Sequence, residues 1–165
     1  MVRKISDHLA SLRQSGWIIE YQSPPEKLPV EITSRYPWIP PEYRQLAEQT
    51  VRARTADETT WLLTGADYGG TSDSAYVWNE AEVQSLDAAG SDAAWKEQII
   101  AFWNDHFPIL FSVKSGYATF AIEKGTLAIV YGEEPEYEET TRIAPSLAEF
   151  LSLLARRDGP LGRFL

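Results

Sequence analysis

The sequence contains one dense cluster of groups that could do acid–base chemistry. Five glutamates lie within the seven residues from Glu133 to Glu139. Glycoside hydrolysis uses two carboxylates on opposite sides of the scissile bond, one with a raised pKa, whereas neighbouring glutamates in a hydrated loop all stay ionised. Calcium loops space their oxygen ligands regularly around a glycine, and EEPEYEE lacks that spacing. We therefore predict a surface loop that either faces a partner or keeps the chain soluble, and not a catalytic or metal site.

Other residue types that carry chemistry are few. The chain has no cysteine, which excludes thiolate ligands, a thiol nucleophile and disulfides. Its histidines, His8 and His106, form no H-x-x-x-H pair, and no G-x-S-x-G motif supplies a nucleophilic serine. We expect both to be structural, with His106 near the last carbonyls of a helix. The loop TGADYGG lacks the lysine of a phosphate loop, and Asp67 would repel phosphate. We expect no enzyme activity, no metal and no cofactor.

Charge is distributed unevenly along the chain. Residues 55–123 hold eleven acidic and two basic side chains, a net of −9, whereas residues 1–54 carry a net of +2. An acidic field repels nucleic acid and anionic membranes, and it speeds the encounter with a basic protein. No apolar run approaches the roughly 20 residues that span a bilayer, and the N-terminus lacks a secretory signal. These features favour a cytoplasmic protein with a protein partner, and neither a nucleic acid nor a membrane.

Hydrophobic periodicity predicts a single α+β domain over residues 1–165, with a mostly antiparallel sheet flanked by four to five helices. Helices are expected at 3–15 and from Pro41, Glu80, Asp92 and Ser146. Strands are expected at 17–21, 28–36, 51–55 and 59–64. Residues 108–131 should form a three-stranded meander with glycine turns at Gly116 and Gly125. Residues 65–73 should form a polar loop.

Four segments, in order, resemble the SUKH superfamily, which includes bacterial immunity proteins and the fungal Smi–Knr regulators. They are IPPEYRQLAEQ, VWNEAEVQSL, FPILFSVKSGYATFAIEKGTLAIVYG and APSLAEFLSLL, and the resemblance covers residues 36–154. It departs from the family pattern at VRARTADETT, where an Asn-Gly-Gly turn is usual. The resemblance implies an α+β domain without a catalytic centre that binds a toxin, often a nuclease.

The first hypothesis is therefore an immunity-type binding module that neutralises a basic toxin domain through an acidic surface. The alternatives are an intracellular regulatory scaffold of the Smi–Knr type and a carbohydrate-active protein. The last would need two tryptophans lining one groove beside two separated carboxylates. Trp38 and Trp78 are the tryptophans expected to be partly exposed. Charge and expected exposure nominate these partner-binding residues: Asp67, Tyr68, Asp73, Trp78, Glu133, Glu134, Glu136, Glu138 and Glu139.

Overall fold

The computed structural model describes residues 3–165, which form one α+β domain, as the sequence predicts. The sheet has seven strands: β1 (Ile18–Tyr21), β2 (Thr50–Arg54), β3 (Thr60–Leu62), β4 (His106–Ser112), β5 (Ala118–Glu123), β6 (Ile129–Glu133) and β7 (Thr141–Ala144). Each strand pairs antiparallel with the next in chain order, so the sheet is one continuous meander. The predicted turn glycines, Gly116 and Gly125, both have positive φ.

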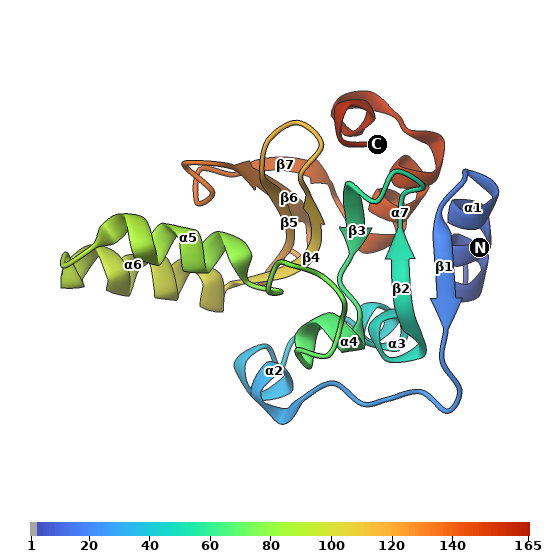
Figure 1. The fold of residues 1–165 in the computed structure, drawn as a ribbon, viewed down its shortest axis with the longest axis horizontal. Helices are drawn as coiled ribbons and strands as arrows, with labels where there is room; N and C mark the ends of the chain where they lie inside the picture. Colours follow the sequence, from blue (N-terminus) through green and yellow to red (C-terminus); the bar gives the residue numbers. More distant parts are fainter. Residues whose placement is uncertain (1–2) are drawn as a thin grey trace.

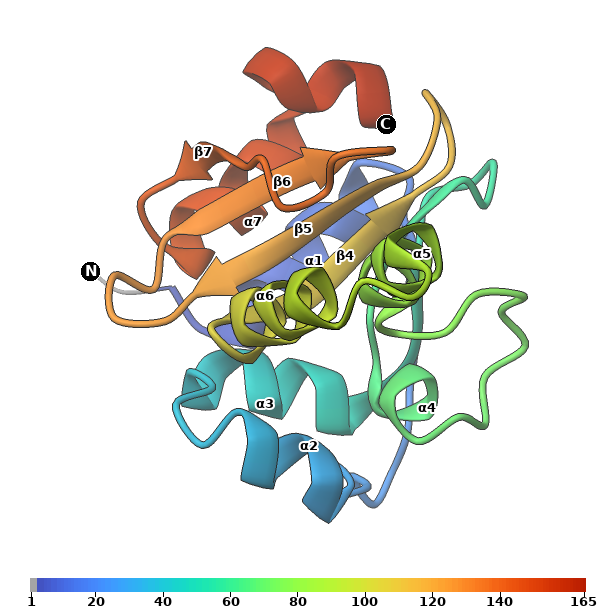
Figure 2. The same ribbon diagram turned by 90° about the vertical axis from the view of Figure 1, so that its left-hand side faces the viewer.

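The helices lie on both sides of this sheet (Figures 1 and 2). They are α1 (Ile5–Gln14), α2 (Val30–Arg35), α3 (Pro41–Gln49), α4 (Gly65–Tyr68), α5 (Glu80–Ala89), α6 (Ala93–Asn104), α7 (Leu147–Arg156) and the 3₁₀ helix η1 (Gly159–Phe164). In Figure 2 the antiparallel pair α5–α6 stands in front of β4 and β5, and α1 and α7 lie behind the sheet. The sheet is therefore the middle layer of three.

Side chains of the central strands alternate between the two faces of the sheet and contribute to an apolar core on each face. Phe120 and Ile122 of β5 point into the larger core with α1, α3 and α7, while Ala121 between them joins the smaller core under α5 and α6. On β6, Ile129 and Val130 divide in the same way. Successive side chains of a strand point to opposite faces, so one short segment anchors both helical layers.

Each of the five predicted helices is present, and its ends follow local chemistry. Pro40 and Pro41 open α3, where a proline costs no hydrogen bond. Ser146 caps α7 by accepting from the backbone N–H of Glu149 at 3.2 Å. Asp92 caps α6 through the N–H of Trp95 at 3.0 Å.

Two predictions about local structure are wrong. Residues 28–36 were expected to be extended, but they contain α2, whose buried Ile32 is flanked at four-residue spacing by the buried Leu28 and Tyr36 just outside the helix. Residues 65–73 were expected to be a loop, but they begin with the single turn α4, which is closed by a capping box between Thr64 and Asp67. With η1, these short elements raise the helix count above the four to five expected.

Candidate functional site

The acid run Glu133–Glu139 begins at the end of β6 and fills the connection to β7. Its backbone folds back on itself at Gly132, where an added Cβ would lie 2.0 Å from the carbonyl oxygen of Tyr137. Only glycine permits this approach. The fold-back gives the five glutamates different surroundings, so they do not form one uniform patch.

Glu133 is held by the C-terminal segment. Its two carboxylate oxygens accept from both terminal nitrogens of Arg163 at 2.6 and 2.8 Å, and these bonds lower the pKa of Glu133. Bidentate guanidinium–carboxylate pairs have a fixed geometry. Glu133 therefore joins β6 to η1 and is already occupied by an intramolecular cation.

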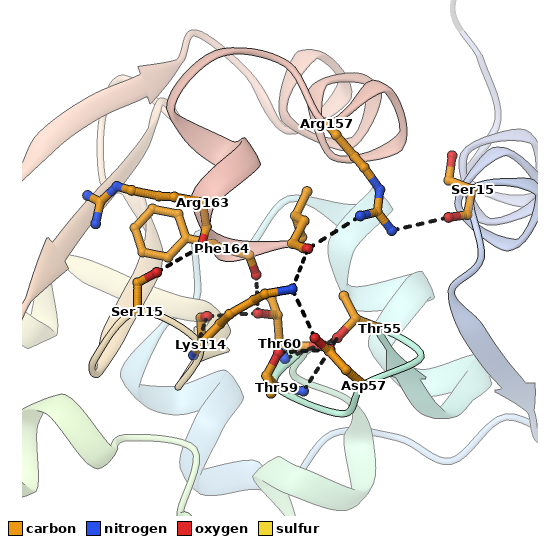
Figure 3. Close-up of polar contacts among 12 residues, drawn as sticks. Ser15, Thr55, Asp57, Thr59, Thr60, Lys114, Ser115, Arg157, Arg163 and Phe164 are labelled. Atoms are coloured by element: carbon orange, nitrogen blue, oxygen red, sulfur yellow. Dashed lines mark hydrogen bonds and ion pairs between the residues drawn. The ribbon is translucent and has the colours of Figure 1, made fainter.

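The segment that carries Arg163 is itself anchored by a polar network (Figure 3). The ammonium group of Lys114 donates to the carbonyl oxygen of Leu165 at 2.8 Å and to the carboxylate of Asp57 at 3.0 Å. The hydroxyl of Thr60 donates to the carbonyl oxygen of Phe164. The Thr60 bond satisfies buried polar groups, and together the three bonds fasten the C-terminal segment to the end of the sheet.

Glu138 is held by the α5–α6 pair. Its Oε2 accepts from the hydroxyl of Ser85 and from the indole N–H of Trp103, both at 2.9 Å. Burial raises the pKa of Glu138, and the two hydrogen bonds counteract part of this effect. The adjacent Tyr137 is buried, and its hydroxyl donates to Gln84 at 2.7 Å. The loop is thus fastened to α5 and α6 by two neighbouring side chains.

The other three glutamates remain at the surface. Glu134 accepts from the backbone N–H of Tyr117 at 3.1 Å, while Glu136 and Glu139 are exposed. A hydrogen bond with Glu136 and its negative charge raise the pKa of Glu139, so these two carboxyls lie side by side. Within residues 3–165, none of the three has a cation at ion-pair distance.

Helix α5 extends this unpaired negative surface. Gln84 of α5 accepts from the hydroxyl of Tyr137 and donates through Nε2 to the carboxylate of Glu80 at 3.4 Å, which places Glu80 beside the loop. Glu80, Val83 and Asp87 follow one another on a single side of α5 at spacings of three and four residues. Val83 is 37% exposed. We call the combined surface the acidic face, which consists of Glu80, Val83, Asp87, Glu134, Glu136 and Glu139.

Two of the predicted partner-binding residues have internal roles. The carboxylate of Asp67 accepts from the N–H of Thr64 at 2.8 Å, and burial raises its pKa. The exposure predicted for Tyr68 is wrong. Its ring stacks on Phe107 with centroids 5.2 Å apart, and its hydroxyl donates to the carbonyl of Pro108 at 2.6 Å. Both side chains help to hold the chain around α4, although Asp67 is only partly buried.

The remaining two are only partly available. Asp73 is exposed, but its carboxylate pairs with Arg52 at 2.8 Å, and both residues line a hollow of about 180 Å³. Trp78 is half-buried and packs edge-on against Tyr36. The structure therefore places the nominated residues in two separate groups, and only Glu134, Glu136 and Glu139 belong to the acidic face. Sequence reasoning missed Glu80 and Asp87, although their helical spacing around Val83 was a usable signal.

The positions of the tryptophans do not support the alternative of a carbohydrate-active protein. Trp38 and Trp78 are half-buried, as predicted, but the most exposed is Trp95, at 46%. The sequence placed Trp95 on the same apolar stripe as Ile99 and Trp103, yet only those two reach the core. Four surface hollows of residues 3–165 are each lined by at most one tryptophan.

His106 behaves as the sequence predicts. Its Nδ1 lies 2.8 Å from the carbonyl oxygen of Phe102 in the last turn of α6, and its ring stacks on that of Phe102. No helix in the described range 3–165 has the length and apolarity needed to cross a membrane. In the same range, no three His, Asp or Glu side chains gather as metal ligands would. Comparison of the chain with family models, with curated proteins and with solved structures finds no match.

Proposed function

We propose that the chain is a non-enzymatic protein-binding module whose acidic face binds a basic protein domain. The biological role that we infer is immunity, in which the module occupies the active surface of a toxin such as a nuclease. The observation that carries the proposal is the set of five unpaired carboxylates on that face, at Glu80, Asp87, Glu134, Glu136 and Glu139. The order of the SUKH-like segments adds to it.

The attraction of a basic partner depends on the carboxylates whose negative charge the fold itself does not neutralise. Several other carboxylates, such as Glu133 and Asp73, are neutralised by an arginine of the chain itself. Within residues 3–165 the acidic face has no such partner, so its field extends into solvent and attracts cations over roughly a Debye length of 8–10 Å. A nuclease presents a basic surface to its substrate, and electrostatic complementarity of this kind raises the association rate.

The face also has features of an interface and not of a catalytic site. Val83 is an exposed apolar group among the carboxylates, and Trp95 and Ile100 add exposed apolar surface on α6. The α5–α6 pair projects from the sheet (Figure 1), which makes it accessible to a docking domain. Burial raises the pKa of the neighbouring Glu138. The Oε2 atom of its carboxylate already accepts hydrogen bonds from Ser85 and Trp103. The raised pKa of Glu138 therefore accompanies its structural role in fastening the loop to α5 and α6.

The test compares two variants of equal net charge. Glu136→Lys with Glu139→Lys reverses two charges on the acidic face, while Glu26→Lys with Glu31→Lys reverses two exposed charges before and within α2. Wild type and both variants serve as bait at low salt for toxin domains of competing cells. We expect a basic toxin domain to bind wild type and the α2 control in one-to-one amount. With the face variant, its association rate should fall by about tenfold or more and lose salt dependence.

Two further results would count against the proposal. If the recovered toxin bound the face variant at the wild-type rate, the acidic face would not be the interface. If only host regulatory proteins were recovered, or the toxin kept its activity in the complex, the immunity role would be wrong and the regulatory scaffold would take its place.

A further inference from the structure

A second surface feature lies on the opposite side of the sheet from the acidic face. It is a hollow of about 230 Å³ where α1, the start of α3, the β5–β6 turn and the start of α7 meet. A cavity of about 150 Å³ accommodates benzene, so this one has room for a ring with small substituents. Its wall is mostly apolar and consists of Ile5, Pro40, Leu127, Leu147, Ala148 and Leu151.

His8 of α1 also lines this hollow, and within residues 3–165 it has no hydrogen-bond partner. The residue is 3% exposed, and both Nδ1 and Nε2 are closed to solvent and bond to no group of that range. Buried polar side-chain atoms are nearly always hydrogen-bonded, because an unpaired atom has lost its bonds to water without replacing them. A molecule in the hollow would supply the missing bond once a small shift of the lining uncovers a ring nitrogen.

The protonation state of His8 defines what that partner must offer. Burial lowers the pKa of His8, the charge of Arg3 lowers it further, and Asp7 opposes the shift. The neutral ring has one N–H donor and one bare nitrogen acceptor. A hydroxyl group satisfies either nitrogen, because it both donates and accepts.

The rest of the lining does not favour a charged molecule. Arg3 and Glu42 contribute charges of opposite sign, and the guanidinium of Arg3 already donates to the carbonyl of Asp7 and the hydroxyl of Ser11 at 3.2 and 2.6 Å. Apart from Ser146, whose hydroxyl caps α7, the remaining wall is apolar, and burying an uncompensated charge against it is unfavourable.

Leu127 adds apolar surface at the rim. Its side chain is 40% exposed and its φ is +58°. Its N–H donates to the carbonyl of Glu123 at 2.9 Å, so the turn between β5 and β6 holds it in this position.

We propose that this hollow binds a small uncharged molecule, the size of a substituted ring, whose hydroxyl group hydrogen-bonds to His8. The apolar body would lie against Leu127 and Leu151. The site is on the far side of the sheet from the acidic face, so this proposal does not depend on the proposed toxin binding.

The test uses a matched pair of probes, p-cresol and toluene, which differ only by the hydroxyl group. Nuclear magnetic resonance of the full chain, with isotope-labelled histidine rings and leucine methyl groups, reports both contacts. We expect low-millimolar p-cresol to shift a ring nitrogen of His8 and to give nuclear Overhauser effects to Leu127 and Leu151. Toluene should give the methyl contacts with about three- to tenfold weaker affinity, the value of one hydrogen bond.

Three variants make the result specific. His8→Phe keeps a ring but removes both nitrogens, so p-cresol should bind it only as tightly as toluene does. Ala148→Phe fills the hollow from its exposed edge and should abolish both probes, while His106→Phe, which replaces the other histidine, should leave both unchanged. The proposal is wrong if p-cresol leaves His8 and Leu127 unperturbed in wild type, or if Ala148→Phe binds it normally. If His8→Phe does not fold, the wild-type spectra and Ala148→Phe decide alone.

Discussion

Replacing Glu138 with alanine should destabilise the protein although the side chain lies in a surface loop. Trp103 is 1% exposed and Ser85 is 5% exposed, and both donate to the same oxygen of Glu138. Alanine removes that acceptor and leaves the indole N–H buried without a partner, at a cost of about 1–3 kcal/mol. The loop also loses its attachment to α5 and α6. We expect Glu138→Ala to lower the free energy of unfolding by about 2–4 kcal/mol.

Glu138→Gln separates the acceptor from the charge. Both donors use Oε2, so the amide oxygen of glutamine can replace it and accept both bonds. The substitution also removes a carboxylate whose pKa is raised by burial, that is, a charge the folded state disfavours. We expect the free energy of unfolding of Glu138→Gln to stay within about 1 kcal/mol of wild type at neutral pH.

The measurement is urea unfolding followed by far-UV circular dichroism, with Glu136→Ala as the control. Glu136 is exposed in the same loop, so its truncation should change the free energy of unfolding by less than about 0.5 kcal/mol. The reasoning is refuted if Glu138→Ala is as stable as Glu136→Ala. It is also refuted if Glu138→Gln loses as much stability as Glu138→Ala, because the charge and not the acceptor would then be essential.

Three other predictions test separate parts of the fold. Gly132→Ala should destabilise by about 3 kcal/mol or more, seen as a lower urea midpoint, because its Cβ would overlap the backbone of Tyr137. The pKa of His8 in the folded protein is lowered below its ordinary value of 6.5. Wild type should therefore lose stability relative to His8→Phe as the pH falls from 6.5 through that folded pKa, and urea titrations at several pH values measure this difference. Thr60→Val should cost about 1–3 kcal/mol and accelerate amide hydrogen exchange in η1, because the carbonyl of Phe164 loses its buried donor.

The sequence was informative where local periodicity decides the outcome. The meander from β4 to β6 follows from alternating apolar residues and the glycines Gly116 and Gly125. The helix α3 follows from its prolines, and α7 from its serine cap. The short α2 was missed because β-branched residues at 30–33 suggested a strand, whereas the spacing from Leu28 to Ile32 to Tyr36 was the stronger signal.

The functional surface depends on long-range contacts that periodicity does not encode. Glu133 and Glu138 are both glutamates in one short run, yet Arg163, 30 residues away, neutralises the first, and Trp103, 35 residues away, binds the second. Folding thus withdraws two of the five carboxylates from the surface and adds Glu80 and Asp87 from a helix. A run of like charges in a sequence shows how densely charged groups follow one another along the chain. The charge available to a partner is what remains after the fold has formed its own ion pairs and hydrogen bonds. For this chain the remaining charge lies beside the exposed Val83 of α5, which is why we propose that this face, and not the run as a whole, binds a partner.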